Sequence, residues 1–186
     1  MLNHIVEKRR AYRSLTPVEI SLEDIRELAE VAKLAPSCFN KQPWRFVFVR
    51  DRELLKKLFK TLSPGNEWVR NASMLIAVFT SPELDCRVGN REYAFFDTGM
   101  SVAFLLLKAT EMGLVAHPIA GYDEEKAKQV LKIPEEMSLI TLIVVGGHSH
   151  RIWEKLSERQ KKDEVSRPER LPIEKFCFID QYPGGH

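Results

Sequence analysis

The sequence predicts an α+β fold, and three observations support that class. Short apolar runs of strand length, such as residues 74–79 and 139–145, alternate with longer stretches whose apolar residues recur at helical spacing. These segments do not follow the strict strand–helix–strand order that a parallel α/β sheet requires. The composition, 44% hydrophobic and 29% charged over 186 residues, is that of one ordinary globular domain spanning residues 1–186.

The N-terminal half is predicted to begin with two helices. Residues 2–10 form a short helix with a basic end. Ser21, followed three residues later by Asp24, has the pattern of a capping box and starts the second helix, which Pro36 ends. The remaining elements of this half are one helix and two strands, at residues 53–62, 44–49 and 74–79.

The C-terminal half is dominated by one long helix, residues 92–112, with Gly113 placed as its C-cap. This helix is apolar nearly all round, so we expect several of its sides to be buried, one of them by a second subunit. Polar connections are expected at residues 81–91 and 154–167. The other segments are predicted as a short strand, a helix capped by Asp123, a buried strand and a weakly alternating tail strand, at residues 115–119, 123–132, 139–145 and 171–179.

Charge, cysteine usage and hydropathy narrow the class of protein. The net charge is only +2 and the arginines are not interleaved with aromatic residues, so no nucleic-acid partner is expected. The odd, sparse set of cysteines favours a reducing compartment over a disulfide scaffold: Cys38, Cys86 and Cys177. His148 and His150 lack further ligands at suitable spacing, so no metal site is predicted. Without a secretory signal or a run of spanning length, a soluble cytoplasmic protein with no membrane partner is expected.

Several common catalytic motifs are absent from the sequence. It contains no P-loop, no G-x-G-x-x-G dinucleotide fingerprint, no G-x-S-x-G elbow and no H-E-x-x-H pair. Three separated stretches stand out instead. They are KRRAYR at residues 8–13, PSCFNKQPW at residues 36–44 and SRPERLPIE at residues 166–174.

Together these stretches resemble the FMN-dependent nitroreductase family. The same resemblance includes Asp-Thr-Gly at residues 97–99, the run GLVAHPIAGYDEE and the Gly146-Gly147 pair, and it extends over about residues 6–178. It implies a mixed, mainly antiparallel sheet flanked by helices, in an intertwined homodimer. It also implies an oxidoreductase in which NAD(P)H reduces FMN at N5 and a nitroaromatic, quinone or similar electron-poor acceptor is then reduced, in a ping-pong cycle. The alternative is a flavin carrier or sensor of the same fold without turnover.

The resemblance places the FMN phosphate among arginines from both ends of the chain. Arg9 and Arg13 would contact it, and Arg167 or Arg170 would close the same pocket. Side-chain chemistry agrees, because a guanidinium group pairs phosphate oxygens at two points. The alternative for these residues is a solvated basic helix end and a charged surface tail.

The resemblance also assigns the contacts to the flavin ring. The loop of residues 36–42 would reach the flavin held mainly by the partner subunit, Asn66 would lie near the pyrimidine edge, and backbone amides around Ala120 would approach N5. The alternative for Asn40 and Gln42 is an Asx-type turn. The complete predicted cofactor-binding set is Arg9, Arg10, Ala11, Arg13, Pro36, Ser37, Cys38, Asn40, Gln42, Asn66, Ile119, Ala120, Gly121, Arg167 and Arg170.

One position departs from the family pattern. Ala11 stands where the family usually has a serine between the arginines. One hydroxyl donor to the phosphate is therefore missing, which should weaken FMN binding by about 1 kcal/mol without abolishing it. The connection between residues 79 and 92 is short, and family members build much of the acceptor pocket there, so the sequence does not identify the acceptor.

Overall fold

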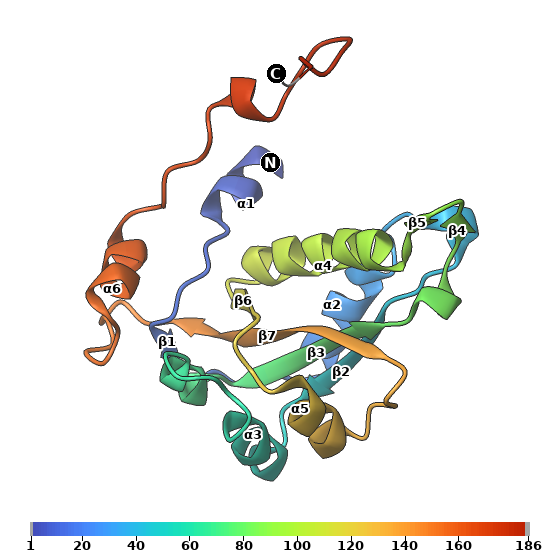
Figure 1. The fold of residues 1–186 in the computed structure, drawn as a ribbon. Coiled ribbons are helices and arrows are strands. Elements are labelled where there is room, and N and C mark those ends of the chain that lie inside the picture. The colour runs from blue at the N-terminus through green and yellow to red at the C-terminus, as the bar shows by residue number, and fades with distance from the viewer. Residues whose placement is uncertain (1, 185–186) are drawn as a thin grey trace.

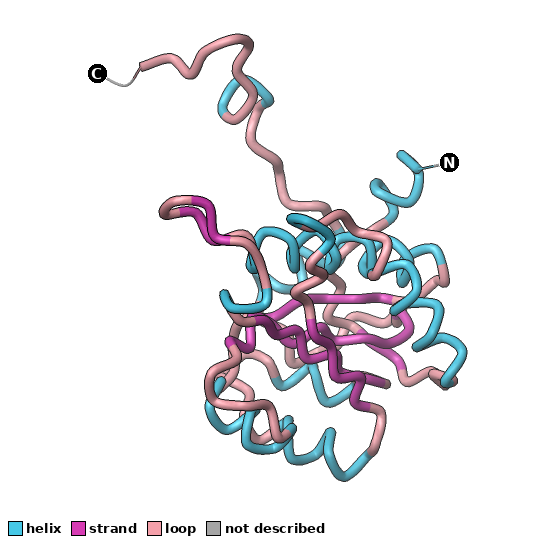
Figure 2. Tube along the Cα trace, turned by 90° about the vertical axis from the view of Figure 1, so that its right-hand side faces the viewer, coloured by secondary structure: helices cyan, strands magenta, loops and turns pink. Residues whose placement is uncertain are grey.

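A five-stranded sheet with helices on both faces forms the body of the protein in a computed structural model that describes residues 2–184 (Figures 1 and 2). The longest strand, β7 (Ser138–His148), pairs with β3 (Met74–Thr80), β6 (Val115–Ile119) and, near its end, β1 (Leu15–Thr16). β3 pairs in turn with β2 (Arg45–Val49). All four pairings are antiparallel, which confirms the predicted α+β class.

The central strands are buried on both faces, as their apolar runs predict. Successive side chains of a strand point to opposite faces. Accordingly Leu75 and Ala77 of β3 belong to one core cluster, whereas Met74 and Ile76 belong to the other. β7 divides in the same way, and its Leu142 lies opposite Ala77 in the ladder.

Two helices cover each face of the sheet (Figure 1). On one face lie α2 (Leu22–Ala32) and the long α4 (Ala94–Glu111), with Leu28 and Leu105 in the core between them and the sheet. On the other face lie α3 (Arg52–Phe59), α5 (Glu124–Leu131) and a 3-10 helix, η2 (Glu67–Asn71). No helix within residues 2–184 combines the length and the apolar character needed to cross a bilayer.

Local sequence signals place several element ends correctly. The capping box is confirmed, because the Asp24 N–H donates to Ser21 Oγ at 3.0 Å and the Ser21 N–H donates to the Asp24 carboxylate at 2.7 Å. Asp123 caps α5, and Gly113 follows α4 with a φ of +78°. The remaining helices are α1 (Leu2–Lys8) and α6 (Glu158–Val165), and α6 lies in a segment that was expected only to be polar.

The predicted tail strand at residues 171–179 is wrong. That segment contains only a short 3-10 turn, η4 (Ile173–Lys175), and the tail runs away from the body in Figure 1. A strand needs a neighbouring strand to hydrogen-bond its backbone groups. Within residues 2–184, no strand pairs with the tail segment. Apolar side chains are exposed along it: Leu171, Ile173, Phe176, Phe178, Ile179 and Tyr182.

The sequence also favoured cysteines that form no disulfide, and this prediction is wrong for two of the three. Cys38 and Cys86 form a disulfide with their Cα atoms 6.0 Å apart, while Cys177 is free and exposed. Between residues 81 and 92 the chain forms a 3-10 turn, η3 (Pro82–Leu84), and a hairpin of two short strands, β4 (Arg87–Val88) and β5 (Arg91–Glu92). The fold therefore brings together two cysteines that are 48 residues apart in the sequence.

Because β7 is buried on both faces over much of its length, we expect the stability cost of a substitution to depend strongly on its position along this strand. Leu142→Ala removes a side chain that is 0% exposed, and we expect the free energy of unfolding to fall by about 2–5 kcal/mol. Ile140→Ala, on the same strand but 37% exposed, should cost clearly less. Urea unfolding of both variants at one protein concentration checks this, and equal losses would contradict the assigned core.

Candidate functional site

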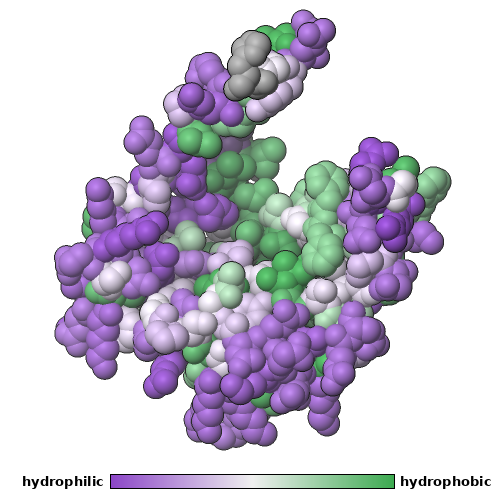
Figure 3. Space-filling model, in the orientation of Figure 1, coloured by the Kyte–Doolittle hydropathy of each residue, from purple (hydrophilic) through white to green (hydrophobic). Residues whose placement is uncertain are grey.

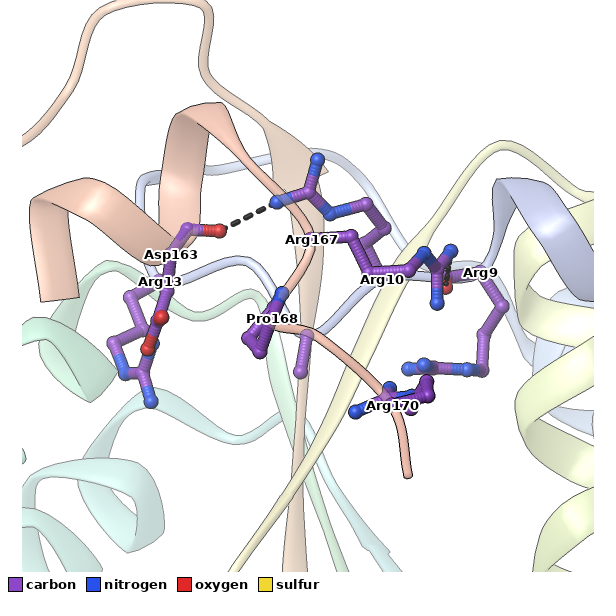
Figure 4. Close-up of a pocket in the computed structure, with 8 residues that line it drawn as sticks. Arg9, Arg10, Arg13, Asp163, Arg167, Pro168 and Arg170 are labelled. Atoms are coloured by element: carbon purple, nitrogen blue, oxygen red, sulfur yellow. Dashed lines mark hydrogen bonds and ion pairs between the residues drawn. The ribbon is translucent and has the colours of Figure 1, made fainter. Parts of the chain in front are cut away.

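Arginines from both ends of the chain line one small hollow of about 190 Å³ (Figure 4). Figure 4 shows Arg9, Arg10, Arg167 and Arg170 near Pro168, with Arg13 and Asp163 on its other side. The structure therefore assembles six of the predicted cofactor-binding residues in one place: Arg9, Arg10, Ala11, Arg13, Arg167 and Arg170.

Helix α6 holds the N-terminal side of this hollow in place. The carboxylate of Glu164, which is only 7% exposed, accepts the backbone N–H of Arg13 at 2.7 Å and that of Ser14 at 3.0 Å. The Arg10 guanidinium donates to the carbonyl of Asp163 at 2.5 Å. A capping box of Ser157 and Gln160 starts the helix. Residues 9–14 thus follow α6 rather than moving independently.

The positive charge of the hollow is only partly neutralised. Arg13 pairs with Asp163 at 3.5 Å, and Arg167 donates to the carbonyls of Glu7 and Arg9. Within residues 2–184, the guanidinium groups of Arg9 and Arg170 have neither a hydrogen-bond nor an ion-pair partner. Partial burial lowers the pKa of Arg9, and the charges of Arg167, Arg170 and Arg10 lower it further. Such crowding of cations favours the binding of an anion.

A second group of predicted cofactor-binding residues, Asn66, Ala120 and Gly121, comes together at the end of β6. The Asn66 side-chain amide donates to the Gly121 carbonyl at 2.9 Å, and the Ser63 N–H donates to the same oxygen at 3.0 Å. A Cβ atom at position 121 would lie 2.4 Å from Asn66 Nδ2, so glycine is needed for this approach. Ala120 beside it is exposed, whereas the Ile119 side chain is buried in the core.

The loop of residues 36–42 has an unusual backbone. Phe39, Asn40 and Gln42 all adopt the left-handed region, with φ of 47°, 57° and 50°. The Gln42 N–H donates to Ser37 Oγ at 2.9 Å, and the Gln42 side chain donates to the carbonyl of Asn40 at 3.2 Å. The Asn40 side chain is exposed. The chain therefore turns here, but not as an Asx-type turn, because the Gln42 N–H donates to Ser37 and not to the Asn40 side chain.

A buried carboxylate of α4, with a second carboxylate beside it, holds this loop. The Cys38 N–H donates to buried Asp97 at 2.6 Å. Asp85 lies beside Asp97, and burial together with this second carboxylate raises the pKa of Asp85. Asp97 therefore anchors the loop to the first turn of α4.

The loop and the arginine hollow lie far apart in one chain. The loop sits at the N-terminal end of α4, beside β4 and β5, whereas the hollow lies by α1, β1 and α6 toward the other end (Figure 1). α4 has 18 residues and is therefore about 27 Å long. Pro36, Ser37, Cys38, Asn40 and Gln42 are thus not brought together with the arginines of the same subunit.

Sequence reasoning missed the residues that support the hollow. His117 of β6 is buried, its Nδ1 lies 3.1 Å from the Tyr12 carbonyl, and its ring lies 4.8 Å from that of Trp68. Burial lowers the pKa of His117 to about 4, and the nearby charge of Arg13 acts in the same direction. Asp163 and Glu164 were missed as well. Their signal is two acids at the end of a polar segment, but their partners are about 150 residues away.

Comparison with known proteins bears on this arrangement. The family model described as "Nitroreductase family" matches residues 6–67 and 62–148. The chain belongs to the nitroreductase family. This family member is 29% identical over 178 residues to a "Putative NADH dehydrogenase/NAD(P)H nitroreductase" of Archaeoglobus fulgidus, and the match covers 92% of this chain and 97% of that protein. The family and its relatives' names support an oxidoreductase.

Solved structures share the fold of this nitroreductase-family chain. A nitroreductase family protein of Streptococcus pneumoniae superposes with a TM-score of 0.79 at 25% identity, covering 96% of this chain and 99% of that chain. An "oxidoreductase containing FMN" superposes with a TM-score of 0.84 at 24% identity, covering 97% of this chain and 92% of that chain. At this identity the second likeness establishes the fold alone.

Neutral His117 predicts a pH-dependent stability. The unfolded chain binds a proton near pH 6.5, whereas the folded protein does so only near pH 4, so protonation favours unfolding between these values. We expect the free energy of unfolding to keep its full value above pH 6.5 and to fall by about 3 kcal/mol as the pH drops to 4. His117→Gln should remove this part of the dependence, and His4→Gln, on exposed α1, should not. Unfolding curves between pH 4.5 and 7.5 check this, and parallel curves for all three proteins would contradict it.

Proposed function

We propose that this protein is an FMN-dependent NAD(P)H oxidoreductase that reduces nitroaromatic, quinone or similar electron-poor acceptors. The observation that carries the proposal is the arginine hollow with its two unpartnered guanidinium groups, because the FMN phosphate is a dianion. Membership of the nitroreductase family supports the redox class. The printed names of two fold neighbours, the FMN-containing oxidoreductase and an iodotyrosine deiodinase bound to FMN, support the choice of cofactor.

The residues of the hollow fit a phosphate in number and chemistry. The guanidinium groups of Arg9 and Arg170 have no partner among the residues that the structure describes, so we assign them the direct contacts. Arg167 is engaged by backbone carbonyls and shapes the pocket from its rim. Arg13 shares its charge with Asp163 and supplies a further donor. Ala11 lines the hollow without a hydroxyl, which leaves the arginines as the principal donors.

The separation of the 36–42 loop from the hollow supports a site shared between two subunits. Figure 3 shows an apolar region between the C-terminal tail and the opposite edge of the molecule. Exposed apolar side chains occur on α1, α4 and the tail, including Leu2, Phe96 and Phe176. Beside α1 and α4 lies an apolar groove lined by Ile5, Val31, Phe104 and Leu107, among others. A homodimer in which the tail of each chain packs on its partner would cover these surfaces and bring each loop to the partner's arginines.

In this arrangement the chain would bind and orient the cofactor, and the cofactor would carry the electrons. When bound, FMN would supply the redox chemistry of hydride transfer from NAD(P)H to the acceptor in a ping-pong cycle. The arginines fix the phosphate end. Asn66, still holding the Gly121 carbonyl, offers its remaining amide groups to the ring, and the exposed backbone at Ala120 lies beside it. Asn40, from the partner's loop, adds amide donors and acceptors.

The absorbance spectrum of the purified protein tests the function. We expect flavin absorbance that NADH or NADPH bleaches without oxygen and that a quinone restores. Bound FMN that neither nucleotide bleaches would instead support a carrier or sensor. A colourless protein that binds no added FMN would overturn the cofactor assignment.

Removal of one free guanidinium group should weaken cofactor binding without unfolding the protein. Arg9→Ala loses charge-assisted hydrogen bonds to the phosphate, so we expect the FMN dissociation constant to rise about 10- to 100-fold. Arg52→Ala, an exposed arginine on α3, is the matched control and should bind FMN normally. Fluorescence titration with FMN measures both. Unchanged affinity in Arg9→Ala would remove this residue from the site.

Hybrid dimers test whether the site is shared between subunits. If Arg9 of one chain and Asn40 of the other serve the same flavin, a dimer of Arg9→Ala and Asn40→Ala chains contains one intact site and one doubly damaged site. We expect separately tagged and purified hybrids to regain tight FMN binding at about half occupancy, since the two sites are independent. If both residues served one flavin within a chain, neither site would be intact and no tight binding would return.

A further inference from the structure

The Cys38–Cys86 disulfide joins two surface segments at the N-terminal end of α4. Cys38 starts the 3-10 turn of the 36–42 loop, and Cys86 immediately precedes the β4–β5 hairpin. Their Cα separation of 6.0 Å lies within the range for an unforced disulfide. Both cysteines are half-buried rather than sealed in the core, so a small thiol can approach them.

The loop on one side of the bridge needs external restraint. Left-handed backbone conformations occur at three non-glycine residues of the loop, Phe39, Asn40 and Gln42. Such conformations persist only when the surroundings impose them. Phe39 is 89% exposed and packs little. The restraints on the loop include its hydrogen bond to Asp97, its internal bond to Ser37, the Arg45 guanidinium, which donates to the Gln42 carbonyl at 3.0 Å, and the disulfide.

The hairpin on the other side is equally dependent on the bridge. Each strand has two residues, β4 and β5 pair with each other, and all their side chains are exposed. An isolated two-stranded hairpin is marginally stable at best. Near the body it is held by the Tyr93 N–H, which donates to the Cys86 carbonyl at 3.2 Å, and by the disulfide.

We propose that Cys38 and Cys86 are a reversible thiol–disulfide site that controls the order of the 36–42 loop. A dithiol reductant attacks one sulfur, forms a mixed disulfide and then closes on itself, so that two electrons and two protons convert the bridge into two thiols. In the oxidised form the loop is fixed. In the reduced form both the loop and the hairpin lose their shared anchor. The consequence for FMN rests on the proposed function, because that is where the loop is assigned to the flavin.

Limited proteolysis tests the site without reference to FMN. Lys41 lies exposed in the loop and is a trypsin site. After reduction with dithiothreitol and alkylation with iodoacetamide, we expect cleavage after Lys41 to become about ten-fold faster, since local opening governs the rate. Cleavage after Lys60, on the opposite face of the sheet, should not change. The reaction includes a chelator, because reduced Cys38 and Cys86 form with Asp85 a group that could hold a metal ion.

Variants separate the bridge from other effects of the reductant. The double variant Cys38→Ser/Cys86→Ser should be cleaved as fast as the reduced protein without any reductant. Cys177→Ser, which removes the free thiol, should behave as the unaltered protein in both redox states. Equal cleavage of oxidised and reduced protein would overturn the proposal, and so would three reactive thiols in air-equilibrated native protein.

FMN titration then links the site to the cofactor. The oxidised protein should bind FMN at least several-fold more tightly than the double variant. If the unaltered protein binds no FMN while Lys41 cleavage still responds to reduction, the cofactor proposal fails and the thiol–disulfide site stands. If Arg9→Ala loses FMN while cleavage ignores the redox state, the opposite holds.

Discussion

The arrangement of the arginine hollow depends on one buried carboxylate. Glu164 accepts two consecutive backbone N–H groups, from Arg13 and Ser14, and so joins the two ends of a chain that are 150 residues apart. The same bonds align the chain as it enters β1, and the next contact, from the Ser149 N–H to the Ser14 carbonyl, ties that entry to the end of β7. A side-chain oxygen pair that binds main-chain donors holds the backbone and leaves the arginine side chains free. Positive charges that repel one another therefore stay together, because the restraint acts on the backbone to which they are attached.

The rest of the molecule keeps this charge close to the sheet but out of the core. His117 lies beneath residues 9–13, and its burial keeps it neutral, so no further cation is added to the cluster. Tyr12 stacks on His148 at 3.8 Å between ring centroids, and the Arg10 guanidinium lies 4.8 Å from the Tyr12 centroid. The flat guanidinium group thus rests on an aromatic face while its edge donates to the Asp163 carbonyl. The hollow itself is lined by arginines together with Ala11, Asp163 and Pro168, which suits a small, strongly charged ligand group.

Sequence reasoning reached the local structure and failed where distant residues decide the outcome. The capping box at Ser21 and the apolar strand predicted at residues 74–79 could be read from the sequence because their signals lie within a few positions of each other. The predicted strand in the tail was wrong because weak alternation of apolar residues cannot reveal whether a neighbouring strand exists. Cys38 and Cys86 were misjudged, since no local pattern indicates that α4 and β4 bring them together. Among the predicted contacts, the arginines converge as expected, and the cofactor roles of the whole set remain predictions. Ile119 proves to be a core residue, because β6 turns its side chain inward.

The C-terminal segment contributes both to the arginine hollow and to an exposed apolar arm, so it links ligand binding to subunit association. Arg167 and Arg170 lie in the hollow, and within ten residues the same segment continues as an arm of exposed apolar side chains. Whatever orders the arginine part also positions the start of the arm, and whatever packs against the arm limits the motion of the arginines. If the arm meets a second subunit, ligand occupancy and subunit association are thermodynamically coupled, and each must strengthen the other by the same factor. Dilution of the protein would then release cofactor, and addition of cofactor would hold subunits together at concentrations where they otherwise separate.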